Sequence, residues 1–256
     1  MDLLENEWYI QAPWGRIAII AWGDCYDPPV LLVHGSMDSA ISFRPLVSKL
    51  PKNFYYIGQF YNQCYPDRLD KLVNLDPINF FAVPPEEFRR WYHIFFTDFY
   101  KNYAKFNTQP ENAPKIKWTE ALQTIRKSRP SLSEEQAAAV LERLSMPAGD
   151  GHIRYTYDLR MKRINGPAYS PEHVKKIFTA TKTPILTVVC QKSLKNKLFR
   201  NTDFLLDEAE YPGRNLRFRQ VDGTHDVHIS HPERVSAYLG QFLVYGIEGL
   251  DNKAKL

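Results

Sequence analysis

The stretch of sequence that decides the fold is Pro29-Val30-Leu31-Leu32-Val33-His34-Gly35-Ser36-Met37-Asp38. Residues 30–33 form an unbroken run of valine and leucine that follows two prolines. A strand that is apolar on both faces is typical of the interior of a parallel sheet. We therefore expect residues 30–33 to form a buried strand in one sheet with the similar run at 185–189. His34 is expected to be structural because it ends that strand.

Strand and helix patterns alternate at both ends of the chain. Strands are predicted at 8–11, 16–22, 53–58, 71–76, 184–190 and 216–221, the first two as a hairpin that turns at 13–15. Helices are predicted at 39–50, 59–67, 84–106, 118–127, 133–144 and 232–245, with a further helix that begins near Ser170. The helix at 133–144 is expected to begin with a capping box, Ser133-Glu134-Glu135-Gln136. This order predicts an α/β fold with a mostly parallel sheet. Residues 1–79 and 184–256 would form its core, and 80–183 an inserted helical cap.

The composition limits the classes of function. The chain has 256 residues, 44% of them hydrophobic, which suits one large α/β domain or two small ones. Its mean hydropathy is −0.42 and no run of 18 apolar residues exists, so we expect no membrane span. The net charge is +4 with scattered basic residues, which argues against nucleic acid as a partner. Cys25, Cys64 and Cys190 lack CxxC spacing, which argues against disulfides and zinc and favours an intracellular setting.

The longest predicted cap helix carries an aromatic stripe. Its members recur at helical spacing: Phe88, Trp91, Tyr92, Phe95, Phe99 and Tyr103. We expect most of these rings to be buried in the core of the cap, although a role in lining a substrate site is an alternative.

The segment His34-Gly35-Ser36 follows the first buried strand. In a hydrolase of this architecture, the loop after such a strand donates a backbone N–H to the oxyanion of a tetrahedral intermediate. Glycine lets the chain turn tightly, and the next residue then points its N–H into the site. The alternative is a plain turn between a strand and a helix.

A second segment, Asp222-Gly223-Thr224-His225, lies between the last strand and the last helix. A histidine at this position can take the proton from a serine nucleophile. His228 and His231 follow at intervals of three, so a metal site is an alternative. However, no HExxH motif accompanies them and the segment is mostly loop, so we expect no metal.

Together these features resemble the α/β-hydrolase superfamily, and more narrowly the serine hydrolase-like proteins with a helical cap. Besides the opening stretch, the resembling segments are Tyr65-Pro66-Asp67-Arg68-Leu69-Asp70-Lys71-Leu72-Val73, Tyr157-Asp158-Leu159-Arg160-Met161-Lys162, Thr183-Pro184-Ile185-Leu186 and Gly223-Thr224-His225. The resemblance implies that Gly35 and Ser36 form the oxyanion loop and that His225 is the general base. The acid of this family follows a late strand. Asp76 ends one such strand, whereas Gln191-Lys192-Ser193 after the other offers no carboxylate, so Asp76 is the expected acid. Its alternative role is to cap a helix before Pro77.

One part of the family pattern has no counterpart in this chain. The sequence contains no Gly-x-Ser-x-Gly, and the nucleophile turn needs those glycines because a β-carbon would clash. After Gly58, residues 59–68 resemble the end of the helix that follows the nucleophile turn in this family. Roughly 50 residues of the pattern are absent, more than one βαβ unit of about 30. Cys64 has no flanking glycine and is not expected to substitute. The chain is either a shortened form of an active enzyme or a protein that lost its nucleophile.

By resemblance, the expected function is serine hydrolysis of an ester or related acyl bond, impaired in this chain because the nucleophile is missing. The expected ligand is a small acyl or ester compound, and no cofactor is expected. The alternative is a pseudoenzyme that binds an acyl ligand without catalysis or acts as a dimer partner.

The chain ends in Ala254-Lys255-Leu256, a close variant of the Ser-Lys-Leu peroxisomal signal. The preceding residues, 249–253, are polar enough to form a frayed tail. The N-terminal residues lack the order of a secretory signal. We therefore expect a peroxisomal import receptor as a partner and a peroxisomal location. If the ending is a coincidence, the protein is cytoplasmic.

Overall fold

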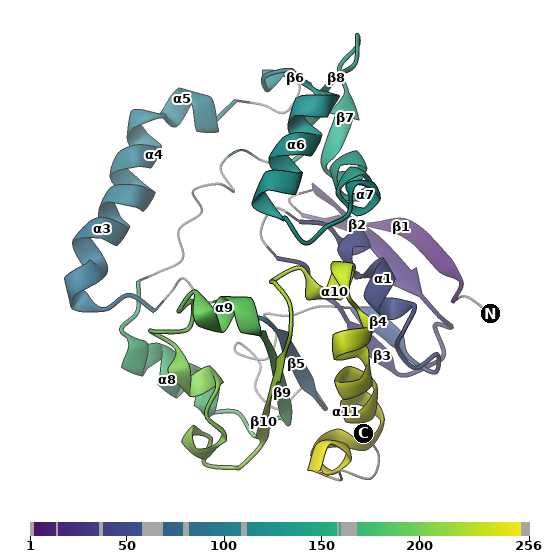
Figure 1. Ribbon diagram of the computed structural model, residues 1–256, viewed down its shortest axis with the longest axis vertical. Coiled ribbons are helices and arrows are strands. Elements are labelled where there is room, and N and C mark those ends of the chain that lie inside the picture. Colours follow the sequence, from purple (N-terminus) through teal and green to yellow (C-terminus); the bar gives the residue numbers. More distant parts are fainter. Residues whose placement is uncertain are drawn as a thin grey trace.

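The computed structural model describes residues 3–13, 15–35, 38–57, 69–78, 82–108, 112–157, 159 and 168–251 (Figure 1). The chain begins with an antiparallel hairpin of β1 (Glu5–Ala12) and β2 (Gly15–Trp22), in which Trp8 pairs with Ile19. The hairpin prediction is confirmed, although β1 is longer at both ends than the pattern indicated.

The main sheet has three parallel strands in the order β10–β9–β5, formed by β5 (Leu72–Leu75), β9 (Ile185–Cys190) and β10 (Leu216–Val221). All six residues of β9 are buried because helices cover both faces of the sheet. Leu186 and Val188 share a core with α11 (Glu233–Asp251), whereas Ile185 and Val189 share one with α8 (Pro171–Thr179). Figure 1 shows α11 on one side of the sheet and α8 and α9 (Gln191–Lys195) on the other. The strand predicted at 185–189 is therefore confirmed as buried and parallel.

A separate parallel pair consists of β3 (Pro29–Leu31) and β4 (Tyr55–Ile57). Val30 and Leu32 pack against the core under α11, but Leu31 and Val33 are 44% and 37% exposed. The prediction that residues 30–33 are buried on both faces, in one sheet with 185–189, is therefore wrong. The physical reason is that, within the described ranges, only one face of β3 is covered and no strand bridges β3 to β5.

Two helices beside the β3–β4 pair differ in length from the prediction: the first is shorter and the last is longer. Residues 39–50 form a 3-10 turn (Ala40–Phe43) followed by α1 (Arg44–Val47), which has Pro45 in its first turn, rather than one helix. The last helix, α11, was predicted to end at residue 245. Gly246 there has a φ of 65°, which interrupts the helix before it continues to Asp251.

The aromatic-rich segment consists of a 3-10 turn (Pro85–Glu87), α3 (Phe88–Tyr92), a π-helical turn (His93–Thr97), α4 (Asp98–Lys101) and α5 (Tyr103–Phe106). In Figure 1, α3, α4 and α5 stand away from the main sheet, and α3 and α4 contain no buried residue. The start of the segment contacts the core at Glu87, whose Oε1 accepts from Arg200 Nη2 at 2.7 Å. The rings contact one another instead; those of Tyr92 and Phe96 stack at 4.9 Å. The prediction that the aromatic stripe is mostly core is therefore wrong.

The following segment has its own core. It contains β6 (Ile116–Lys117), α6 (Trp118–Ser128), α7 (Glu134–Leu144), β7 (Ser145–Pro147) and β8 (His152–Tyr155). The predicted capping box of α7 is confirmed: Gln136 N donates to Ser133 Oγ, and Ser133 N donates to Gln136 Oε1. The small antiparallel sheet, in the order β6–β8–β7, was not predicted.

The remaining elements are short. Two 3-10 turns (Asp203–Leu205 and Glu208–Glu210) lie between α9 and β10, and α10 (Val227–Ser230) lies between β10 and α11. α8, which the sequence division assigned to the cap, packs on the main sheet through Val174. Among the helices of the described ranges, none is long and apolar enough to cross a membrane.

Candidate active site

Asp76 follows β5 directly and lies at the carboxyl end of the main sheet. Its backbone N–H donates to Val188 O at 2.7 Å, which continues the pairing of β5 with β9 by one residue. Its φ of 45° then turns the chain away from the sheet, in a region that aspartate visits more readily than most residues. The side chain is held in the interior, with Asp76 only 2% exposed.

Three donors hold the Asp76 carboxylate. Cys190 N–H at the end of β9 donates to Oδ1 at 3.0 Å, and the Ser193 hydroxyl donates to Oδ2 at 2.6 Å. The third partner is Nδ1 of His225, 2.8 Å from Oδ2. A buried carboxylate needs such donors, because leaving its oxygens unpaired would carry a large desolvation penalty. The orientation of this carboxylate is therefore set by a main-chain group of β9 and by side chains of α9 and of the loop that follows β10.

His225 lies in the loop between β10 and α10. Gly223 allows this loop to turn, since its φ of 136° is strained for any residue with a side chain. The hydrogen bond to Asp76 raises the pKa of His225, and the nearby carboxylate charges of Asp76 and Asp226 act in the same direction. The side chain is 55% exposed. If Nδ1 carries the proton donated to Asp76, Nε2 is left as an acceptor on the accessible side of the ring.

The structure therefore brings Asp76 and His225 together, although they are 149 residues apart in the sequence. Ser193 was missed as a member of the site. It lies in α9, whose first residues, 191–193, were considered only as a source of a carboxylate. Its hydroxyl instead orients the carboxylate supplied by the neighbouring strand end.

The expected oxyanion loop is described only in part. Gly35 is exposed, and a β-carbon added there would meet no atom within 4 Å. Ser36 lies outside the described residues. His34, expected to be structural, is exposed instead, with Nδ1 2.9 Å from Gly35 O, because the strand before it has one uncovered face.

An arginine that the sequence analysis did not single out joins this loop to the histidine loop. Arg129 Nε donates to Asp226 Oδ1 at 2.8 Å, and Nη2 lies 2.5 Å from the same oxygen and 3.1 Å from Asp38 Oδ2. Asp226 directly follows His225, and Asp38 closes a turn on Gly35 through a 3.2 Å backbone hydrogen bond. The Gly35 loop and the His225 loop therefore meet at one guanidinium.

The three histidines weighed as metal ligands have separate surroundings. His225 faces Asp76, the His228 ring packs 5.6 Å from the Phe43 ring, and His231 Nδ1 lies 3.1 Å from Ser230 Oγ. Burial lowers the pKa of His228 to about 4, which keeps its imidazole neutral. Within the part of the chain that the structure describes, no group of three or more His, Cys, Asp or Glu side chains is placed to hold a metal ion.

The cysteines do not supply a nucleophile to this site in the described ranges. Cys190 is fully buried, and burial, with the charge of Asp76, raises the pKa of its thiol to about 12. A thiol that stays protonated is a poor nucleophile. Cys25 is exposed, and Cys64 lies outside the described residues.

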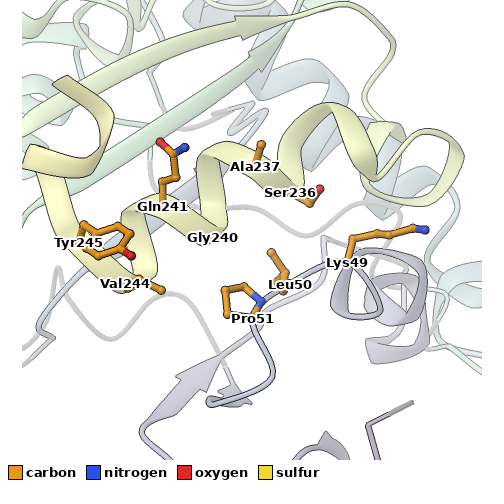
Figure 2. Close-up of a pocket in the computed structure, with 9 residues that line it drawn as sticks. All are labelled: Lys49, Leu50, Pro51, Ser236, Ala237, Gly240, Gln241, Val244 and Tyr245. Carbon is orange, nitrogen blue, oxygen red and sulfur yellow. The ribbon is translucent and has the colours of Figure 1, made fainter. Parts of the chain in front are cut away.

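A groove of about 470 Å³ lies elsewhere, between α11 and the residues that follow α1 (Figure 2). Its lining consists of Lys49, Leu50, Pro51, Ser236, Ala237, Gly240, Gln241, Val244 and Tyr245. None of these residues belongs to the Asp76–His225 pair or to the loops around it. We therefore do not assign the chemistry of the site to this groove.

Comparisons with known proteins extend over most of the chain. A serine hydrolase-like protein of Danio rerio is 22% identical over 300 residues, which cover 93% of this chain and 88% of the relative. A protein of the same name from Mus musculus is 23% identical over 308 residues, with coverages of 94% and 96%. The human serine hydrolase-like protein is 48% identical over a shorter stretch of 55 residues, which is 22% of this chain and 27% of the relative. No protein-family model matches.

Solved structures are similar over a comparable extent. A hypothetical protein from Pseudomonas aeruginosa PAO1 superposes with a TM-score of 0.72 at 14% identity and covers 94% of this chain and 100% of its own. E-2-(acetamidomethylene)succinate hydrolase gives 0.59 at 12% identity, with coverages of 94% and 100%. An alpha/beta hydrolase from Novosphingobium aromaticivorans gives 0.54 at 15% identity, with coverages of 91% and 96%.

Proposed function

From the α/β-hydrolase fold of this chain and its similarity to serine hydrolase-like proteins, we propose that it binds a small ester or related acyl compound beside Asp76 and His225. The observation that carries the proposal is the 2.8 Å contact between His225 Nδ1 and Asp76 Oδ2 at the carboxyl end of the sheet. Ligands of open α/β sheets bind outside this end of the strands.

The chemistry of the pair is that of a general base with an orienting acid. Nε2 of His225 accepts a proton from a hydroxyl group, while Asp76 holds the ring through Nδ1 and stabilises the imidazolium that forms. The raised pKa of His225 suits a base that works near neutral pH. The N–H of Ser36, which lies outside the described residues, is proposed to donate to the oxyanion, as the resemblance implies.

We also propose that turnover is impaired in this form, because the chain contains no Gly-x-Ser-x-Gly. Ser193 is close to the pair, but its hydroxyl donates to Asp76 and not to His225. The alignment with the zebrafish relative supports a missing segment: it is 300 residues long, which exceeds the 256 residues of this chain. Loss of the nucleophile from such a triad lowers kcat by about a millionfold, and binding and oxyanion contributions remain.

The test compares the full chain with His225→Ala in three assays: probe labelling, ester hydrolysis and thermal unfolding with a ligand analogue. We expect no labelling by a fluorophosphonate probe, and hydrolysis of p-nitrophenyl acetate and butyrate no faster than for His225→Ala. A ketone analogue of the butyrate ester should raise the Tm of the wild-type chain and do so less for His225→Ala. His152→Gln is the matched control, since His152 is a half-buried histidine whose Nδ1 contacts the Asp150 carbonyl, away from the pair.

Two results would contradict the proposal in different ways. Labelling by the probe together with hydrolysis abolished in His225→Ala would show an activated nucleophile, and the impairment would be wrong. An analogue that raises Tm equally in wild type and His225→Ala would show that the ligand does not bind beside the pair. Analogue binding without turnover supports the binding alternative over an active hydrolase.

A further inference from the structure

Arg129 occupies a place that no part of the triad chemistry explains. It is the first residue after α6, and its side chain leaves that segment to reach two loops of the hydrolase core. The three charged side chains are mostly shielded from solvent, with exposed fractions of 19% for Arg129, 14% for Asp38 and 9% for Asp226. Shielded charges of this kind persist only when they are paired and hydrogen-bonded.

The same segment holds the histidine loop at two further points. Thr224 Oγ1 donates to Ser131 Oγ at 2.6 Å, and Gln136 Nε2 donates to Ile229 O at 3.0 Å. These contacts lie on either side of His225. Residues 129–136 therefore hold the chain on both sides of the imidazole, and Arg129 also extends the contact to the Gly35 loop.

We propose that Arg129 is a positioning residue, which fixes the His225 loop against the Gly35 loop and balances the negative charge beside the imidazole. The proposal rests on the proposed function, in which His225 is the base. The geometry explains why arginine is suited to the place. A planar guanidinium presents several N–H groups in a rigid fork, so it can pair with two carboxylates at once, whereas a lysine ammonium cannot hold the same geometry.

The proposal predicts that removing different charges near His225 changes its pKa in opposite directions. Asp76 and Asp226 raise the pKa of His225, whereas Arg129 lowers it. His228, another titratable group close by, is neutral near pH 7. Removing the arginine charge should therefore raise the pKa of His225, and neutralising Asp226 should lower it. A purely structural disturbance of the loop would not produce opposite changes from the two partners.

The experiment is an NMR titration of the His225 ring protons in the full chain. We expect Arg129→Met to strengthen proton binding by about threefold or more, and Asp226→Asn to weaken it by a similar factor. Arg129→Lys keeps the charge and should lie close to wild type in the titration. It should nevertheless show faster amide exchange at residues 224–229, because the two-carboxylate geometry is lost.

Arg126→Met is the matched control, since Arg126 lies in the last turn of α6, just before Arg129, and pairs with the exposed Glu134. It should leave the His225 titration unchanged. If Arg129→Met does not fold, Asp226→Asn and Arg129→Lys carry the test, and thermal unfolding of each variant shows which are folded. A folded Arg129→Met with an unchanged or lowered pKa of His225 would overturn the proposal. So would an Arg129→Lys variant with unchanged amide exchange.

The outcome is separable from that of the proposed function. If binding of the ketone analogue does not depend on His225 but the two titration shifts occur, the ligand assignment fails and the role of Arg129 stands. If binding of the analogue depends on His225 but the titration shifts are absent, the role of Arg129 fails and the ligand assignment stands.

Discussion

At the scale of single residues, the site depends on the hydrogen bonds that three groups make to the buried carboxylate of Asp76. Oδ1 of Asp76 accepts from the main chain of β9, and Oδ2 accepts from both Ser193 and His225. The imidazole is thus tied to the sheet through a group that is itself held by two donors. Asp76 and His225 could be named from the sequence because each follows a recognisable strand. Ser193 and Arg129 could not, since a hydroxyl within a short helix or a guanidinium just after one acquires its role only from the folded contacts.

The pair makes stability depend on pH in a defined direction. The hydrogen bond to Asp76 raises the pKa of His225 above its ordinary value of 6.5, so protonation of His225 favours the folded state. This contribution is fully present below pH 6.5 and is lost as the pH rises through the raised pKa. We expect His225→Gln to lose more free energy of unfolding, relative to wild type, at pH 6 than at pH 9.

Urea denaturation at the two pH values measures this difference. Asp76→Asn, which removes the cause of the shift, should abolish most of the same pH dependence, and His152→Gln should retain it. A wild-type chain that gains stability relative to His225→Gln as the pH rises from 6 to 9 would have the opposite sign and would contradict the assignment.

At the scale of elements, a prediction was confirmed where other elements cover the segment on the faces that its apolar residues occupy. β9 is apolar on both faces and has a helix layer on each. β3 has the same pattern, but within the described ranges it has one paired edge and one covered face, so Leu31 and Val33 are exposed. The aromatic helices show the same limit. Spacing indicated an apolar surface but could not indicate what, if anything, covers it.

The capping box at the start of α7 is a local feature that the sequence predicted fully. Ser133 and Gln136 satisfy backbone donors that the helix itself cannot pair. We expect Ser133→Ala to reduce the free energy of unfolding by about 1 kcal/mol. Chemical denaturation checks this value.

The control for this change is Ser236→Ala in the first turn of α11, where the hydroxyl makes only a 3.4 Å contact with Glu233 O. We expect that substitution to stay within about 0.5 kcal/mol of wild type. Equal effects of the two substitutions would mean that the capping box contributes nothing specific.

At the scale of the whole molecule, α11 carries the chain along the sheet to its last described residue. Arg217 Nε and Nη2 donate to the two carboxylate oxygens of Asp251 at 2.6 and 2.7 Å, and Arg219 Nη2 donates to Leu250 O at 2.8 Å. The residues up to 251 are therefore anchored to β10. Ala254-Lys255-Leu256 lies beyond this anchor and outside the described residues.

We propose that this tripeptide directs import into peroxisomes, as its similarity to Ser-Lys-Leu suggests. A fluorescent protein fused to the N-terminus, which leaves the last residue free, should accumulate in peroxisomal puncta. Deletion of Leu256 should disperse it. Lys253→Ala, next to the tripeptide, is the control and should leave the puncta in place. A diffuse signal from the intact fusion would mean that the ending is a coincidence.

The order of strands in the main sheet also has a consequence for synthesis on the ribosome. β5 pairs with β9, and the Asn74–Thr187 contact within that pair joins residues 113 positions apart. Such long-range parallel pairing must close a large loop before it gains any contact energy, and it is therefore slow. When β5 emerges, its partner has not yet been translated, whereas residues 116–155 bring their own local core. We expect that segment to fold first and the Asp76–His225 pair to form later, once β9, β10 and the His225 loop have emerged.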